Sequence, residues 1–265
     1  MKIGFWNTKY AFESPEKSQK AAEHIEKLDT DIIGILEIAR SQERIYDLSF
    51  LRSLGYAGMV ADYSNNPYFE ASQRPRVPAN YMPQMGLFSR IGSTKISAVT
   101  LGQRHGLTFT TADNPEVRGL LVHFDDRQEK NRLTALANIP PASQTNAPDV
   151  IFGDFNAMHR KSPHARILRA TAQLGLPAAL RLPKRLSSVL NRMQQMACGQ
   201  TIEQIEEYGY TPATDNYRST LFLGRLGVGQ IDHIYTSQAT KATNFTRHYS
   251  PISDHAALQC RIQKI

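Results

Sequence analysis

The stretch Asp149-Val-Ile-Phe-Gly-Asp154-Phe-Asn156 is the most informative part of this 265-residue chain. Its apolar part, Val150 to Phe152, predicts a buried strand that delivers Gly153, Asp154 and Asn156 into a turn. Because Asp154 and Asn156 are two residues apart, an extended backbone places their side chains on the same face. Asp and Asn also favour turns for local reasons, so this stretch alone is a weak signal of function.

Four further segments place reactive side chains at the end of an apolar run. They are Phe5-Trp6-Asn7, Ile32-Ile-Gly-Ile-Leu-Glu37, Ile231-Asp-His-Ile-Tyr235 and Ser253-Asp254-His255. In this order, and with Gly86-Leu-Phe-Ser-Arg90 between them, the segments resemble the endonuclease/exonuclease/phosphatase superfamily from Ile3 to Leu258. Five ordered motifs are much more specific than one.

The resemblance implies a fold and a class of reaction. The implied fold is a two-sheet α/β sandwich, and the implied reaction is hydrolysis of phosphodiesters or phosphomonoesters with a divalent metal. Helical patterns over His164–Leu174, Ser187–Ala197 and Thr201–Tyr208 follow the Gly-Asp-Phe-Asn motif. We therefore predict one domain over residues 1–265, with a helical insertion at 157–215.

Composition is compatible with this interpretation. A chain with 41% hydrophobic residues can bury one substantial core, and its longest apolar runs are far shorter than the roughly 20 residues that span a bilayer. Without a signal peptide's apolar segment, and with only two cysteines, we expect a soluble, cytoplasmic protein. The net charge of +7 favours an anionic partner.

The expected metal site is rich in oxygen ligands. Carboxylates and amides without thiolates suit Mg2+ or Mn2+. Glu37 is the principal ligand that we predict, and the resemblance places Asn7 near the metal, as a ligand or as a residue that orients a neighbour. It also places Asp254 close to the metal. Each of these side chains has a simpler alternative role, as a strand cap or a turn former.

The resemblance also implies roles for the catalytic residues. Asp154 would orient or deprotonate the attacking water, and Asn156 would donate a hydrogen bond to the developing phosphorane oxygen. His255 would contact the phosphate or act as acid or base, and Asp232 would orient that histidine. The neighbouring His233 points to the opposite strand face and is expected to be structural.

One position departs from the family's pattern. Many members end the strand before the Gly-Asp-Phe-Asn motif with a histidine or tyrosine that contacts the scissile phosphate. We predict that strand at Leu133 to Ile139, where the matching position falls on Asn138, which cannot be a general acid at neutral pH. Arg118 lies where members often keep a strand arginine, although a cross-strand ion pair explains it equally well.

A series of basic residues follows the catalytic motif, beginning with Arg160 and Lys161 and continuing through His164, Arg166, Arg169, Arg181, Lys184, Arg185 and Arg192. These charges are candidates for binding a polyanion's backbone. Tyrosines of an expected loop at 56–84 are candidates for stacking on unpaired bases. Solvated helix faces explain such charge runs equally simply.

The leading hypothesis is a metal-dependent phosphodiester hydrolase, a nuclease that acts on DNA or RNA. A phosphomonoesterase, or a phosphodiesterase for lipid headgroups or small nucleotides, would share the same catalytic set. From another class, the chain would be a non-catalytic nucleic-acid-binding module, as the Asn at position 138 would allow. The sequence leaves the oligomeric state open.

Overall fold

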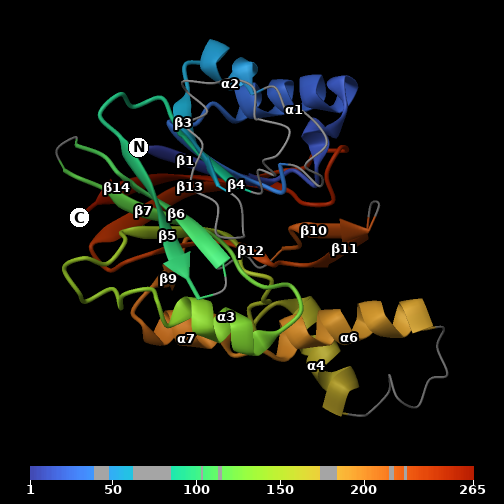
Figure 1. Ribbon diagram of the computed structural model, residues 1–265. Helices are drawn as coiled ribbons and strands as arrows, with labels where there is room; N and C mark the ends of the chain where they lie inside the picture. The colour runs from blue at the N-terminus through green and yellow to red at the C-terminus, as the bar shows by residue number, and fades with distance from the viewer. Residues whose placement is uncertain are drawn as a thin grey trace.

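The computed structural model describes residues 1–38, 48–61, 85–102, 104–112, 115–173, 184–214, 218–223 and 226–265. Within these ranges, two six-stranded sheets pack face to face, and helices cover both outer faces (Figure 1). The α/β sandwich predicted from the sequence is therefore confirmed. No helix in the described ranges has the length and apolar character needed to cross a membrane.

The first sheet has the strand order β13-β14-β1-β2-β4-β3. Its strands are β1 (Lys2–Asn7), β2 (Ile32–Leu36), β3 (Ala57–Ala61), β4 (Met85–Ser89), β13 (Thr240–His248) and β14 (Ala257–Lys264). The pair β1 and β2 is parallel and therefore needs a crossover, which η1 (Ala11–Glu13) and α1 (Pro15–Leu28) supply. With α2 (Ser49–Ser53), α1 covers the outer face, where Trp6, Ile33 and Ile35 are buried.

The second sheet has the order β5-β6-β7-β8-β12-β9. Its strands are β5 (Lys95–Leu101), β6 (Arg104–Thr110), β7 (Arg118–His123), β8 (Val150–Asp154), β9 (Thr211–Pro212) and β12 (Asp232–Thr236). Here β7 and β8 are the parallel pair, connected through α3 (Glu129–Leu136). Together with α7 (Thr201–Glu207), α3 covers the outer face of this sheet (Figure 1).

The main core lies between the sheets, where alternate residues of each strand meet. Ile32 and Leu36 of β2 belong to the same buried cluster as Val150 and Phe152 of β8. Gly34 marks a point of close approach, because a Cβ atom there would lie 2.6 Å from Leu121 Cδ1. A larger residue at this position would force the sheets apart.

Helices occupy the described part of the region after the Gly-Asp-Phe-Asn motif, where the sequence predicts them. They are α4 (Pro163–Gln173), α6 (Lys184–Cys198) and α7, and α4 packs with α6 below the second sheet in Figure 1. Met158, Ala165, Leu168 and Met196 form part of their shared apolar cluster. A two-stranded hairpin of β10 (Leu221–Leu223) and β11 (Leu226–Gly229) projects beside them.

Two predictions of local structure are wrong. The segment Leu133 to Ile139 is not a strand: α3 ends at Leu136 and is followed by a turn. Its burial follows helical spacing, with Arg132, Ala135 and Leu136 facing inward, and Asp125 accepts hydrogen bonds from backbone N–H groups just before the helix. The expected loop at 56–84 begins instead with β3, and its remaining part, from 62 onward, lies outside the described residues.

Candidate active site

A row of titratable side chains crosses three adjacent strands of the second sheet. His123, the last residue of β7, is paired with Asp154, the last residue of β8, and Asp154 is paired with Asp232, the first residue of β12. Residues in such a row share a face of the sheet. The register therefore brings an imidazole and two carboxylates together at one end of the sandwich, and all three side chains are buried.

The backbone at this end of the sheet is held in uncommon conformations. Gly153 has φ +143°, and a Cβ atom there would lie 1.9 Å from the carbonyl oxygen of Val122 on β7, so only glycine fits. Asn156 and Glu37 adopt the left-handed region at φ 48° and 49°. Non-glycine residues pay a free-energy cost in that region and are concentrated at functional sites.

The first sheet contributes three more groups at the same end. Asn7 ends β1, Glu37 follows β2, and His255 precedes β14. Backbone hydrogen bonds from Thr8 to Leu36 and from Tyr10 to Glu37 join the two strand ends. The site is thus assembled from both sheets, and its geometry depends on how the sheets pack.

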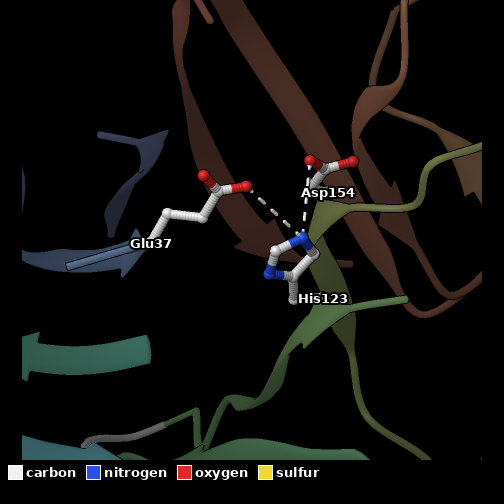
Figure 2. A group of neighbouring side chains, drawn as sticks. All are labelled: Glu37, His123 and Asp154. Atoms are coloured by element: carbon white, nitrogen blue, oxygen red, sulfur yellow. Dashed lines mark ion pairs between the residues drawn. The ribbon is translucent and has the colours of Figure 1, made fainter. Parts of the chain in front are cut away.

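Glu37, His123 and Asp154 form the centre of the site. Figure 2 shows the three side chains pointing toward one another from the ends of β2, β7 and β8. His123 Nε2 lies 3.9 Å from Glu37 Oε1 and 3.7 Å from Asp154 Oδ2. These ligand-type atoms are within 4.8 Å of one another, which makes the group a candidate metal site.

Asn7 bridges the two carboxylates. Its Nδ2 donates to Glu37 Oε1 at 3.0 Å and to Asp154 Oδ2 at 3.2 Å, while its Oδ1 accepts from the Lys9 backbone at 3.2 Å. Ser253 holds the strand end by donating to the Asn7 carbonyl oxygen at 2.7 Å. Through these hydrogen bonds Asn7 connects the carboxylates of Glu37 and Asp154.

Asp232 and His255 form a buried pair. His255 Nδ1 lies 2.9 Å from Asp232 Oδ2 and 4.0 Å from Asp154 Oδ2. Ser253 Oγ accepts from the His255 backbone N–H, and the His255 carbonyl oxygen accepts from the Trp6 indole. The ring is therefore fixed from several sides, and its Nε2 is directed away from Asp232.

The packing of these charges shifts their pKa values in opposite directions. Burial, with the neighbouring Asp232, raises the pKa of Asp154 to about 6. Burial alone would lower the pKa of His255, but Asp232, helped by Asp154 and Asp254, raises it to about 10. Burial by itself would raise the pKa of Glu37, but the nearby His123 and the hydrogen bond from Asn7 hold that pKa below its ordinary value. Near neutral pH the site thus holds a cationic His255 beside a carboxyl group that titrates.

Two more predicted residues lie at the border of this group. The Asn156 backbone donates to Asp154 Oδ1 at 2.9 Å, and its Nδ2 donates to the Phe124 carbonyl oxygen at 3.0 Å. Since an amide nitrogen carries two hydrogens, a second donor remains for a ligand. Asp254 forms an ion pair with Lys9 at 3.1 Å, and its other oxygen lies 3.8 Å from His255 Nε2.

The structure does not bring Asn138 or Arg118 to this site. Asn138 follows α3, is exposed, and donates to the Thr134 carbonyl oxygen at 2.8 Å. Arg118 lies at the start of β7, at the opposite end of the strand from His123, where it donates to the Thr145 carbonyl oxygen and faces Glu116. The imidazole that lies beside Glu37 and Asp154 is instead that of His123.

Sequence reasoning missed His123 although a signal was present. The run Leu120-Leu-Val-His123 ends an apolar strand with a histidine, the same pattern that identified the other site residues. Lys9 was also missed. Its backbone has a left-handed conformation, with φ 49°, and no pattern in the sequence indicates this. Arg160 and Lys161 follow the Gly-Asp-Phe-Asn motif as exposed side chains.

The donor set fits a hard divalent cation. In the group of Glu37, His123 and Asp154, two of the three ligand-type atoms are carboxylate oxygens. A second group of this kind consists of Asp154, Asp232 and His255. Within the described residues, Asp232 Oδ1 is buried without a hydrogen-bond partner. The charge of Asp232 is compensated at its other oxygen by His255, whereas the oxygen-rich group around Glu37 and Asp154 favours Mg2+ or Mn2+.

The chain belongs to the Endonuclease/Exonuclease/phosphatase family, whose model matches residues 4–255. Members of this family are hydrolases that act on phosphate esters. The resemblance seen in the sequence is therefore confirmed across the chain. No curated protein matches it in sequence.

Solved structures with the same fold differ in the activities that they are named for. A 3' phosphatase from Neisseria, bound to product DNA hairpin, is 14% identical with a TM-score of 0.62, covering 99% of each chain. A mannosyl-6-phosphatase from Bacteroides thetaiotaomicron is 13% identical with a TM-score of 0.57, again covering 99% of each chain. The human Nocturnin catalytic domain, with bound sulfate, is 14% identical with a TM-score of 0.58, covering 100% of this chain and 93% of that one. At these identities the likeness shows a shared fold.

Proposed function

We propose that the chain is a Mg2+- or Mn2+-dependent phosphodiesterase that cleaves nucleic acid. The observation that carries the proposal is the position of Asp154 Oδ2, which lies 3.2 Å from Asn7 Nδ2, 3.7 Å from His123 Nε2 and 4.0 Å from His255 Nδ1. A buried carboxylate surrounded by an amide and two imidazoles suits transfer of a proton from water beside an anionic substrate.

The proposed roles follow from the charges. Glu37 would hold the metal, whose charge would neutralise the phosphate and lower the pKa of bound water. The raised pKa of Asp154, about 6, suits a general base at neutral pH. His255, protonated up to a pKa of about 10, presents a cation for a nonbridging oxygen, and the second Nδ2 hydrogen of Asn156 is a further donor.

We assign to His123 the contact with the scissile phosphate that the sequence resemblance placed at Asn138. His123 is buried between two carboxylates, so it is poised to contact the scissile phosphate or the leaving oxygen. An imidazole, unlike an amide, can carry a proton to that oxygen. His123 would therefore be able to protonate the leaving group, which Asn138 cannot do.

The second candidate is hydrolysis of a phosphomonoester, since two of the similar structures are named as phosphatases. The same catalytic groups serve either reaction, so the two functions are distinguished by which substrate the protein hydrolyses. We would incubate the protein with Mg2+ or Mn2+ and plasmid DNA, single-stranded DNA, RNA, bis-p-nitrophenyl phosphate or p-nitrophenyl phosphate. The controls are EDTA and an Asp154→Asn/His255→Gln double variant, whose folding is checked by circular dichroism.

Three outcomes are distinct. Cleavage of a polymer that EDTA and the double variant both abolish supports the nuclease. Turnover of the monoester alone moves the function to a phosphatase. No turnover of any substrate, with DNA binding retained after Glu37→Ala, would refute the enzyme and favour a binding module.

A further inference from the structure

A hollow lined by basic side chains lies along one face of α4. Its volume is about 530 Å³, and it is lined by Arg160, Lys161, Arg166, Arg169, Ala170 and Gln173. The last four recur at helical spacing and so share one face of the helix. Arg160 and Lys161 come from the turn that precedes it.

The positive charge of this basic hollow is only partly balanced. Arg169 pairs with Glu203 at 3.2 Å, whereas Arg160, Lys161 and Arg166 are exposed and form no ion pair within the described ranges. The start of α4 adds the positive end of a helix dipole. Like charges held this close repel one another, and an anion in the hollow would relieve that repulsion.

The turn that carries Arg160 and Lys161 is held in place by His159. The buried His159 ring accepts from the Lys161 backbone at 3.1 Å, and its Nε2 lies 2.8 Å from Glu206 Oε1. The His159 carbonyl oxygen also accepts from the Ser162 backbone at 2.8 Å. The hydrogen bond to His159 is the main reason that the pKa of Glu206 is lowered, and Arg160 and Lys161 lower it further. These contacts give the two cations a fixed backbone.

The basic hollow is close enough to the catalytic end to contact the same substrate molecule. Arg160 follows Asn156 by four residues, so their Cα atoms are at most about 14 Å apart. From Arg166 to Gln173 the helix adds about 10 Å. At about 3.4 Å per nucleotide along a strand, these two lengths together correspond to at most roughly seven nucleotides.

We propose that this basic hollow binds the phosphodiester backbone of a nucleic-acid strand on one side of the bond that is cleaved. The inference rests on the proposed function and narrows its substrate to a polymer. A small headgroup would fill only the catalytic site and leave these cations unused. Because the contacts are to phosphates, binding would be insensitive to base sequence.

Hydrolysis of substrates of increasing length tests the proposal. For the wild type, we expect kcat/KM to rise with oligonucleotide length up to roughly seven nucleotides beyond the cleaved bond. In an Arg160→Gln/Lys161→Gln/Arg166→Gln variant, the loss on a 20-nucleotide strand should exceed the loss on bis-p-nitrophenyl phosphate by about 10-fold or more. A matched control, Lys17→Gln/Lys27→Gln/Lys95→Gln, removes the same charge from exposed positions elsewhere. It should match the wild type on both substrates.

A binding measurement tests the same proposal without depending on turnover. Fluorescence anisotropy would follow labelled single-stranded DNA, RNA and duplex DNA on Asp154→Asn protein, with and without the three substitutions in the basic hollow. Losing three phosphate contacts to a single strand should reduce the slope of log K against log salt by about 2. The control triple variant should leave that slope unchanged.

The outcomes separate this inference from the proposed function. Equal losses of kcat/KM on the small ester and the long strand, or an unchanged slope of log K against log salt, would refute strand binding by the basic hollow. Either result would leave the proposed phosphodiesterase activity standing. Binding that depends on the basic hollow, without turnover of any ester, would keep the inference and refute the enzyme. Binding of phosphatidylserine vesicles, but not of oligonucleotides, would refute the inference and indicate that the basic hollow binds a membrane surface.

Discussion

Replacing Asp232 with Asn should change the pH dependence of the reaction more than its maximum. Asp232 Oδ2 lies 2.9 Å from His255 Nδ1 and is the main reason that the pKa of His255 is raised from 6.5 to about 10 against the effect of burial. That difference corresponds to about 5 kcal/mol of preference for the imidazolium. The neutral amide removes the charge and keeps the size of the side chain.

The expected magnitude follows from protonation. If the pKa of His255 returns toward its ordinary value of 6.5, only a small fraction of the protein carries the cation at pH 8. The kcat/KM on bis-p-nitrophenyl phosphate should then fall about 30-fold at pH 8, with a much smaller loss near pH 6. The acid limb should move to lower pH as well, because Asp232 contributes to the raised pKa of Asp154.

The assay is a kcat/KM profile between pH 5 and 10 for the wild type and for Asp232→Asn. An Asp254→Asn variant provides a graded comparison, since that carboxylate is partly exposed and lies 3.8 Å from Nε2. Its alkaline limb should move less than that of Asp232→Asn. A uniform loss of activity at every pH, with both limbs of the Asp232→Asn profile unmoved, would refute the assignment of His255 as the cation of the site.

Three further predictions concern the site and its support. His123→Ala should lower kcat by roughly 10²- to 10⁴-fold whereas Asn138→Ala should stay within about twofold, and steady-state kinetics showing equal effects would contradict the geometry. Gly153→Ala should destabilise the fold by about 3 kcal/mol or more in urea unfolding, because its Cβ would meet the Val122 carbonyl oxygen; a change below 1 kcal/mol, on the order of ordinary surface substitutions, would disprove this. Burial lowers the pKa of His233 to about 4, so the contribution of His233 to folding stability should be fully present above pH 6.5 and should fall by about 3 kcal/mol as the pH drops to 4. His233→Gln should flatten that dependence, and an unchanged slope would contradict it.

Local patterns in the sequence predicted which strands carry the candidate site and most of the side chains that meet there. Asn7, Glu37, Asp154, Asp232 and His255 each follow or begin an apolar run, and the structure places them together at one end of the sandwich. This was predictable because a strand's burial and the polar residue at its end are local properties of the chain. The helices after the motif were predictable from helical spacing for the same reason.

Contacts between distant parts of the chain place His123, and not Asn138, beside the carboxylates of Glu37 and Asp154. Asn138 and His123 both follow apolar stretches, but the register of β7 against β8 places His123 beside Asp154, while the segment before Asn138 is helical. The position of Arg118 and the convergence of basic side chains on one face of α4 were decided in the same way. Register, sheet packing and the pKa values of buried groups depend on contacts between residues far apart in the chain, which no local pattern encodes.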